Sequence, residues 1–82
     1  MKILYFAKLK QLIGKSEETI CIKKKTKISQ VINELKKRSD VYNFAFKEIN
    51  SLQYAVNCEY VDLDFSVTDS DELAIFPPAS GG

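Results

Sequence analysis

The sequence predicts an α+β domain in which a mixed sheet wraps around one main helix. Three observations lead to this prediction. One stripe of apolar side chains with helical spacing lies near the middle of the chain, short strand-like runs flank it on both sides, and the last run ends at two prolines. The 82 residues suffice for one domain, close to the lower limit for a self-supporting core.

The first predicted strand covers residues 2–8, and its alternation puts apolar side chains on both faces, with Leu4 and Phe6 sharing one of them. Such a strand is either central and covered twice, or it keeps one face for a partner. Residues 9–13 form a short amphipathic turn, and Gly14 is suited to end it.

A second strand is predicted over residues 18–22, paired with the first as a hairpin. It places Cys21 at a buried position. Cys21 and Cys58 match no metal-ligand or C-x-x-C spacing, which indicates free thiols and no metal site. The chain has no histidine, so Ser-His-Asp chemistry is excluded and Cys58 has no histidine to activate it as a nucleophile.

A run of lysines at residues 23–27 follows the second strand. No aromatic residues interleave it, so it favours a solvated face that guards an edge strand over a nucleic-acid site. Charge is also divided along the chain. Residues 1–47 carry 12 basic and 4 acidic residues, whereas residues 48–82 carry 7 acidic residues and no basic ones. This division suggests partner surfaces of complementary sign.

The main helix is predicted to begin at Thr26 as N-cap and to end at Ser39 and Asp40. Its apolar stripe, spaced i, i+3, i+4 and i+7, belongs to the core and consists of Ile28, Val31, Ile32 and Leu35. Residues 41–53 are expected to form a short helix and a loop over the edge of the sheet.

A third strand is predicted over residues 52–56, with a tight turn at 57–59 and a short return strand at 60–62. Residues 64–71 are expected to form a polar connection in which Phe65 and Val67 point inward. The acidic residues of this part lack the spacing and the central glycine of a calcium loop.

The final strand, residues 73–76, is expected to lie parallel to the first and to end at Pro77 and Pro78, which cannot donate to a sheet. Small residues follow, and the diglycine end is thin enough to enter a narrow channel. Termini of small residues often only fray. The position of this one directly behind a strand and two prolines instead predicts an extended arm whose carboxylate, on Gly82, is the functional group.

The end of the chain, residues 69–82, resembles the small subunit of molybdopterin synthase, as do the opening residues 2–14 and the Val56-Asn57 pair. The resemblance implies a ubiquitin-like β-grasp domain over residues 1–76, a free extended tail over residues 77–82, and a role as sulfur carrier in molybdenum cofactor synthesis. One position departs from the family, which usually has glycine where this chain has Ser70. If the backbone there needed a positive φ, serine would cost on the order of 1 kcal/mol.

The same resemblance implies the chemistry and the partners. Gly82 would be adenylated by a separate ATP-dependent adenylating enzyme, receive sulfur from a donor such as a cysteine desulfurase or rhodanese, and carry a thiocarboxylate. It would then donate sulfur to a cyclic pyranopterin precursor in the large synthase subunit, within a heterotetramer. The tail residues inserted there would be Pro77, Pro78, Ala79, Ser80 and Gly81, and the docking surface would include Phe6, Lys10, Tyr60 and Phe76.

The chain is thus expected to bind no cofactor itself, with ATP used by its partner, and to act as a sulfur-donating subunit without catalysis of its own. It is expected in the cytoplasm, bound to neither nucleic acid nor membrane. Two alternatives remain. Carriers for thiamine or tRNA thiolation also end in Gly-Gly but generally lack the preceding Pro-Pro. A ubiquitin-like protein modifier would instead use adenylated Gly82 to acylate lysines.

Overall fold

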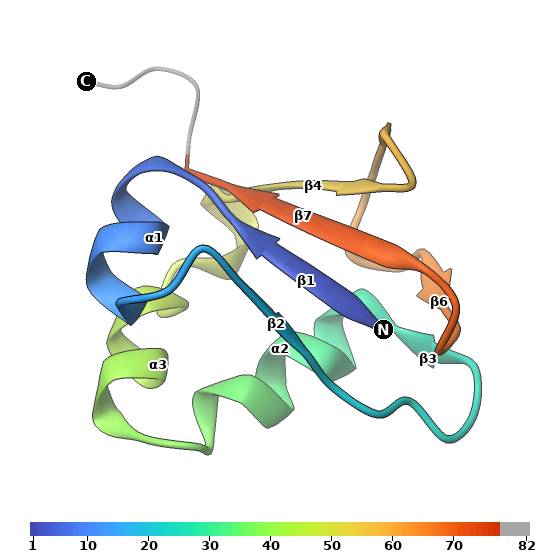
Figure 1. Cartoon of the computed structure of the whole chain (residues 1–82), viewed down its shortest axis with the longest axis horizontal. Helices are drawn as coiled ribbons and strands as arrows, with labels where there is room; N and C mark the ends of the chain where they lie inside the picture. The colour runs from blue at the N-terminus through green and yellow to red at the C-terminus, as the bar shows by residue number, and fades with distance from the viewer. Residues whose placement is uncertain (78–82) are drawn as a thin grey trace.

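The computed structural model describes residues 1–77, and its centre is a five-stranded mixed sheet (Figure 1). The strands follow the order β2 (Glu17–Thr19), β1 (Lys2–Tyr5), β7 (Glu72–Phe76), β4 (Gln53–Val56) and β5 (Glu59–Val61). β1 and β7 run parallel, and the other neighbours are antiparallel. The predictions of an α+β fold, of a hairpin-like pairing of the first two strands, and of a last strand parallel to the first are confirmed.

One face of this sheet forms the core together with the helices. The register aligns Tyr5 with Ile75 and Ile75 with Tyr54, so these side chains share a face, and all three are buried. The helices lie on that side of the sheet (Figure 1). The predicted apolar stripe of helix α2 (Ile28–Lys36) is buried at every position, which confirms its assignment to the core.

The first strand is shorter than predicted. It ends at Tyr5, and helix α1 (Ala7–Ile13) begins where the sequence predicted continued strand. Phe6 is still extended, but Ala7 has a φ of 53°, which turns the chain away from the sheet. The turn allows Leu9, with 2% of its surface exposed, to enter the core. Gly14, at φ 87°, ends the helix as predicted.

The second strand is also shorter than predicted, and Cys21 is exposed, so its predicted burial is wrong. Beyond Thr19 the N–H of Ile20 still donates to the Met1 carbonyl at 2.9 Å. The N–H of Ile22, however, donates to the side chain of Asp69 at 2.9 Å and not to a strand. Ile20 and Ile22 pack against the core, and the alternation along the backbone therefore turns Cys21 towards solvent.

A second, two-stranded sheet joins β3 (Thr26–Lys27) to β6 (Ser66–Val67) and was not predicted. It shifts the helix N-cap from Thr26 to Lys27, whose N–H donates to the Gln30 side chain at 3.3 Å. Val67 is buried as predicted, whereas Phe65 is 42% exposed and does not point inward.

The segment after α2 contains helix α3 (Asp40–Ala45) and a 3-10 turn, η1 (Ile49–Ser51). Ser39 does not close α2, because its hydroxyl accepts the N–H of Tyr42 at 3.4 Å and thereby begins α3. The predicted short helix is confirmed, but it packs against α1 and α2 and not over the sheet edge. None of the helices in residues 1–77 has the length and apolar character needed to cross a bilayer.

Candidate functional site

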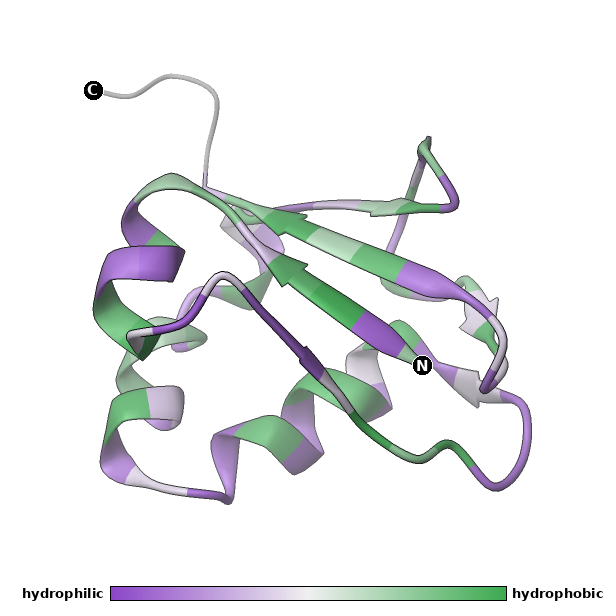
Figure 2. Cartoon of the chain, viewed as in Figure 1, coloured by the Kyte–Doolittle hydropathy of each residue, from purple (hydrophilic) through white to green (hydrophobic). Residues whose placement is uncertain are grey.

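The strand that precedes the tail, β7, has one face that is fully buried against the helices and one face that points away from them. Leu73 and Ile75 point to the helices and have no exposed surface. Ala74 and Phe76 point to the opposite face, on which Leu4 of β1 and Ala55 of β4 are the register partners of Ala74. Hydrophobic residues cover most of β1 and β7, in contrast to the hydrophilic β2 (Figure 2). The sheet therefore has an apolar outer face in addition to its core face.

Three aromatic side chains meet on this outer face. The rings of Phe6 and Phe76 are stacked, with centroids 4.6 Å apart and planes inclined by 12°. The ring of Tyr60 also lies near Phe76, and the centroids of these two rings are 6.1 Å apart. We call Phe6, Tyr60 and Phe76 the aromatic surface. The family resemblance implied all three as docking residues, and the fold brings them together from three separate segments.

The side chains of the aromatic surface are more exposed to solvent than side chains that pack in a core. Phe6 is 39% exposed and Tyr60 is 73% exposed, while Phe76 between them is half-buried. Aromatic side chains are enriched in protein interfaces because they bury large areas at a small cost in conformational entropy. A cluster of three at the end of one strand has the composition of a docking surface.

The predicted tail begins beside this surface. The N–H of Phe6 donates to the Ile75 carbonyl at 3.3 Å, which ties the start of α1 to the end of β7. Pro77 follows directly and is half-buried. The other predicted tail residues, Pro78, Ala79, Ser80, Gly81 and Gly82, lie outside the described residues.

Lys10, the predicted charge contact, lies in the last turn of α1 and is exposed. None of the ion pairs among residues 1–77 involves it. Its ammonium group is therefore available to a partner on the helix that follows Phe6. No ion pair or cation–π contact joins Lys10 to the aromatic surface in the described part of the chain, and its role stays a prediction.

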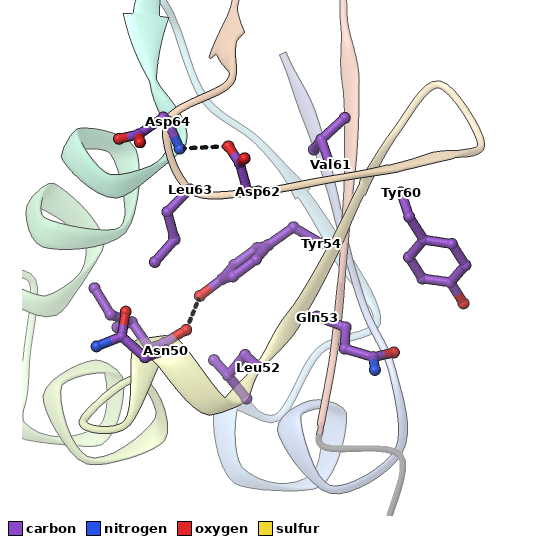
Figure 3. Close-up of a pocket in the computed structure, with 10 residues that line it drawn as sticks. Asn50, Leu52, Gln53, Tyr54, Tyr60, Val61, Asp62, Leu63 and Asp64 are labelled. Atoms are coloured by element: carbon purple, nitrogen blue, oxygen red, sulfur yellow. Dashed lines mark hydrogen bonds between the residues drawn. The ribbon is translucent and has the colours of Figure 1, made fainter.

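A groove of about 810 Å³ lies next to the aromatic surface, between η1, β4, β5 and the segment after β5 (Figure 3). The Tyr54 hydroxyl in it donates to the Ile49 carbonyl at 2.9 Å, and burial raises the pKa of this phenol above its ordinary value. Tyr60 lines the groove too but projects from the opposite side of the β4–β5 ribbon (Figure 3). The groove's lining contains neither a cysteine nor a lysine that could act as a nucleophile.

The sequence reasoning missed a polar network centred on Glu18, whose side chain is only 11% exposed. Tyr5 and Tyr42 donate hydroxyl hydrogen bonds to its carboxylate, and Arg38 donates to it at 2.7 Å. Burial acts to raise the pKa of Glu18, but these three hydrogen bonds outweigh burial and hold the pKa below its ordinary value. The network joins β1 and β2 to α3 and to Arg38 in the loop between α2 and α3, so its role is structural. Its members are too far apart in sequence for any motif to indicate them.

The turns next to the start of β7 show whether Ser70 needs a positive φ. Asn57 has a φ of 51°, as its predicted left-handed role requires, but Ser70 does not have a positive φ. Asp71 shapes this turn instead by accepting the Thr68 N–H at 2.7 Å, and this bond is the main cause of its lowered pKa. Asn57 accepts the N–H of Glu72 at 3.0 Å. Serine at position 70 therefore carries no left-handed strain.

Comparison with known proteins extends these observations to the whole chain. The family model of the ThiS family matches residues 3–82. The molybdopterin synthase sulfur carrier subunit of Dictyostelium discoideum is 39% identical, over 99% of this chain and 94% of its own. The Escherichia coli protein of the same name is 32% identical, over 100% of this chain and 99% of its own.

Two solved structures share the fold. A Pyrococcus furiosus protein assigned as molybdopterin converting factor, subunit 1, has a TM-score of 0.76 and 33% identity, over 95% of both chains. The small archaeal modifier protein 1 of Methanosarcina acetivorans has a TM-score of 0.72 and 26% identity, over 99% of this chain and 94% of its own. The fold is the ubiquitin-like β-grasp, and the chain belongs to the ThiS family, together with the molybdopterin synthase sulfur carrier subunits.

Proposed function

We propose that this protein is the sulfur carrier subunit of a molybdopterin synthase. The observation that supports this most directly is the aromatic surface, which lies at the point where the chain leaves β7 for its C-terminal tail. A docking surface in this position would fix the start of the tail on a partner and direct the following residues into that partner's active site. The names of the full-length relatives point to the same role.

The chemistry proceeds at the carboxylate of Gly82. A carboxylate is a poor electrophile because attack adds negative charge to an anion. The adenylating partner joins it to AMP from ATP and releases pyrophosphate, which makes an acyl carbon with a good leaving group. Hydrosulfide then attacks this carbon, the C–S bond forms, and AMP departs with the electrons of the broken C–O bond. The product is a thiocarboxylate, whose sulfur is a nucleophile towards the pyranopterin precursor.

Partner proteins supply the sulfur and bind the sulfur-loaded tail. The large synthase subunit binds the aromatic surface and receives Pro77 to Gly82, with Lys10 adding a charge contact at the edge of the interface. A cysteine desulfurase or rhodanese supplies the sulfur as an enzyme-bound persulfide, and a thiol reductant releases it as hydrosulfide while the reductant is oxidised to a disulfide. The small subunit contributes no catalytic group beyond its tail, because the whole chain contains no histidine and no phosphate-binding loop motif. Both cysteines are free thiols, which fits the reducing cytoplasm in which we place the reaction.

Mass spectrometry of the intact protein tests this proposal. Incubated with ATP and sulfide alone, the protein should stay unmodified. Addition of the adenylating enzyme should give an acyl-adenylate and then a mass gain equal to one oxygen replaced by sulfur, located on Gly82 by fragmentation. A persulfide on Cys21 or Cys58 would add a whole sulfur atom. Sulfur on Cys58, with transfer abolished by Cys58→Ser, would refute the proposed role of the tail.

A second function is supported by the similarity to the Methanosarcina acetivorans modifier protein. A protein modifier would use the same adenylated Gly82 to acylate lysine amines of other proteins. Covalent conjugates in cell lysate that disappear on deletion of Gly82 would favour this function. Co-purification with a pterin-binding synthase subunit, without such conjugates, would favour the sulfur carrier.

A further inference from the structure

The sheet has an open edge at β2, far from the aromatic surface. In antiparallel pairing, alternate residues of a strand turn their N–H and C=O groups towards the neighbour. Ile20 is one of these residues, because it exchanges both backbone hydrogen bonds with Met1, at 2.9 and 2.7 Å. Thr19 and Cys21 therefore direct their backbone groups outward. None of the hydrogen bonds within residues 1–77 uses the backbone of Cys21.

A groove of about 1100 Å³ runs beside this edge, between residues 19–24 and α2. β2 and the segment after it pass along α2 (Figure 1). The apolar part of the groove's lining consists of the half-buried Ile20 and Ile22, with the buried core residues Val31 and Leu35 behind them. An open strand edge with a groove at its side is the arrangement by which proteins bind extended peptides as an added strand.

The rim of the groove is basic. Lys23, Lys24, Lys37 and Arg38 line it, against one acidic residue, Glu34. Lys37 is paired with Glu34 at 3.2 Å, and Arg38 is paired with Glu18 at 2.7 Å. Within the part of the chain that the structure describes, Lys23 and Lys24 form no ion pair. The groove therefore has an excess of uncompensated positive charge, which is complementary to an acidic occupant.

We propose that this groove binds an extended acidic segment of a partner protein, which adds as a strand to the outer edge of β2. A nucleic acid fits the groove less well, because no aromatic side chain lines it on which bases could stack. The site is also separate from the synthase-docking surface. Phe6, Tyr60 and Phe76 do not line it, and β2 and β5 form opposite edges of the sheet. Both surfaces can thus be occupied at once.

Nuclear magnetic resonance with a defined probe tests the proposal. The probe is an eight-residue peptide in which valine alternates with glutamate. It should produce saturable shifts in the amides of residues 19–24 and α2, and slow the hydrogen exchange of the Thr19 and Cys21 amides. The same peptide with N-methyl groups at alternate positions should not bind, because it cannot complete a ladder on the edge.

Two charge-matched double variants test the basic rim. Lys23→Glu with Lys24→Glu should weaken binding of the peptide by roughly tenfold at low salt, because two attractive charges become repulsive. Lys8→Glu with Lys47→Glu changes the net charge equally but lies outside the groove, and should change binding by less than about twofold. Equal weakening by both pairs would show unspecific attraction and overturn the proposal.

Three further outcomes would also overturn it. Shifts confined to Phe6, Tyr60 and Phe76 would place the peptide on the aromatic surface. Tighter binding of an oligothymidylate than of the peptide at the same amides would identify a nucleic-acid site. Absence of saturable binding, with self-association of the Lys23→Glu, Lys24→Glu variant, would show that the lysines only protect an edge strand from mispairing. None of these results affects thiocarboxylate formation at Gly82, so the two proposals can fail independently.

Discussion

Neighbouring residues at the end of β7 allow the roles of the proposed docking face and of the core face of one strand to be tested separately. Phe76 lies on the outer face, stacked on Phe6 at 4.6 Å, whereas Ile75 is fully buried on the core face. We predict that Phe76→Ala weakens binding to the large synthase subunit while the domain stays folded. Ile75→Ala, the matched control, should lower the stability of the domain and leave the affinity of the folded protein unchanged.

The magnitudes follow from burial. Complete burial of a phenylalanine contributes about 3 kcal/mol at most, and a stacked aromatic pair adds roughly 1 kcal/mol. Half-buried Phe76 should therefore contribute about 2 kcal/mol to stability, which leaves a domain of this size folded, since such domains have about 4–12 kcal/mol in total. Removal of a central aromatic residue from an interface costs about 2 kcal/mol or more, which weakens binding at least about 30-fold. Ile75→Ala should cost roughly 2–5 kcal/mol of stability.

Urea denaturation measures the stability of both variants, and calorimetric titration with the large subunit measures their affinity. The titration is done at a temperature at which both variants are folded by circular dichroism. Two results would refute the reasoning. Phe76→Ala could bind as tightly as the unchanged protein, or it could unfold as readily as Ile75→Ala, in which case Phe76 would belong to the core.

Three further predictions concern the fold and its pH dependence. Because the pKa of Glu18 is lowered from 4.5, its carboxylate stabilises the fold above that pH, and the contribution is lost as pH falls through the folded-state pKa. Glu18→Gln should therefore lower the urea midpoint at pH 7, and the difference from the unchanged protein should shrink as the pH falls below 4.5. Ser70→Gly should leave the melting temperature equal or slightly lower, because no positive φ is relieved. Asn57→Ala should cost about 1–3 kcal/mol in urea denaturation, and Asn57→Gly less, since glycine tolerates the φ of 51°.

The sequence predicted those parts of the fold in which one residue pattern decides the structure. The stripe of α2 has only one apolar face, so its burial followed from spacing alone. The lengths of β1 and β2 could not be obtained in this way, because a tertiary contact sets each end. Leu9 enters the core only if the chain turns at Ala7, and Ile22 leaves the strand because Asp69, remote in sequence, accepts its N–H.

The candidate site was predictable through family resemblance more than through residue pattern. Alternation alone left both faces of the first strand apolar and could not tell which one was covered. Nor could it place Phe6 beside Phe76, since their contact depends on the parallel pairing of β1 and β7. The Glu18 network could not be predicted from the sequence for a similar reason. Its four side chains come from β1, β2, α3 and the loop between α2 and α3, and only the folded chain brings them around the Glu18 carboxylate.

The position of β7 is compatible with a contribution of one short strand both to stability and to the proposed docking. It is the central strand of the sheet, hydrogen-bonded on both sides by β1 and β4, so its backbone is fixed whatever its outer side chains contact. Leu73 and Ile75 hold the strand to the helices. Ala74 and Phe76 can therefore remain available for a partner without loss of the core. A tail that begins directly after such a strand starts from a rigid support, which is what precise delivery of a terminal carboxylate requires.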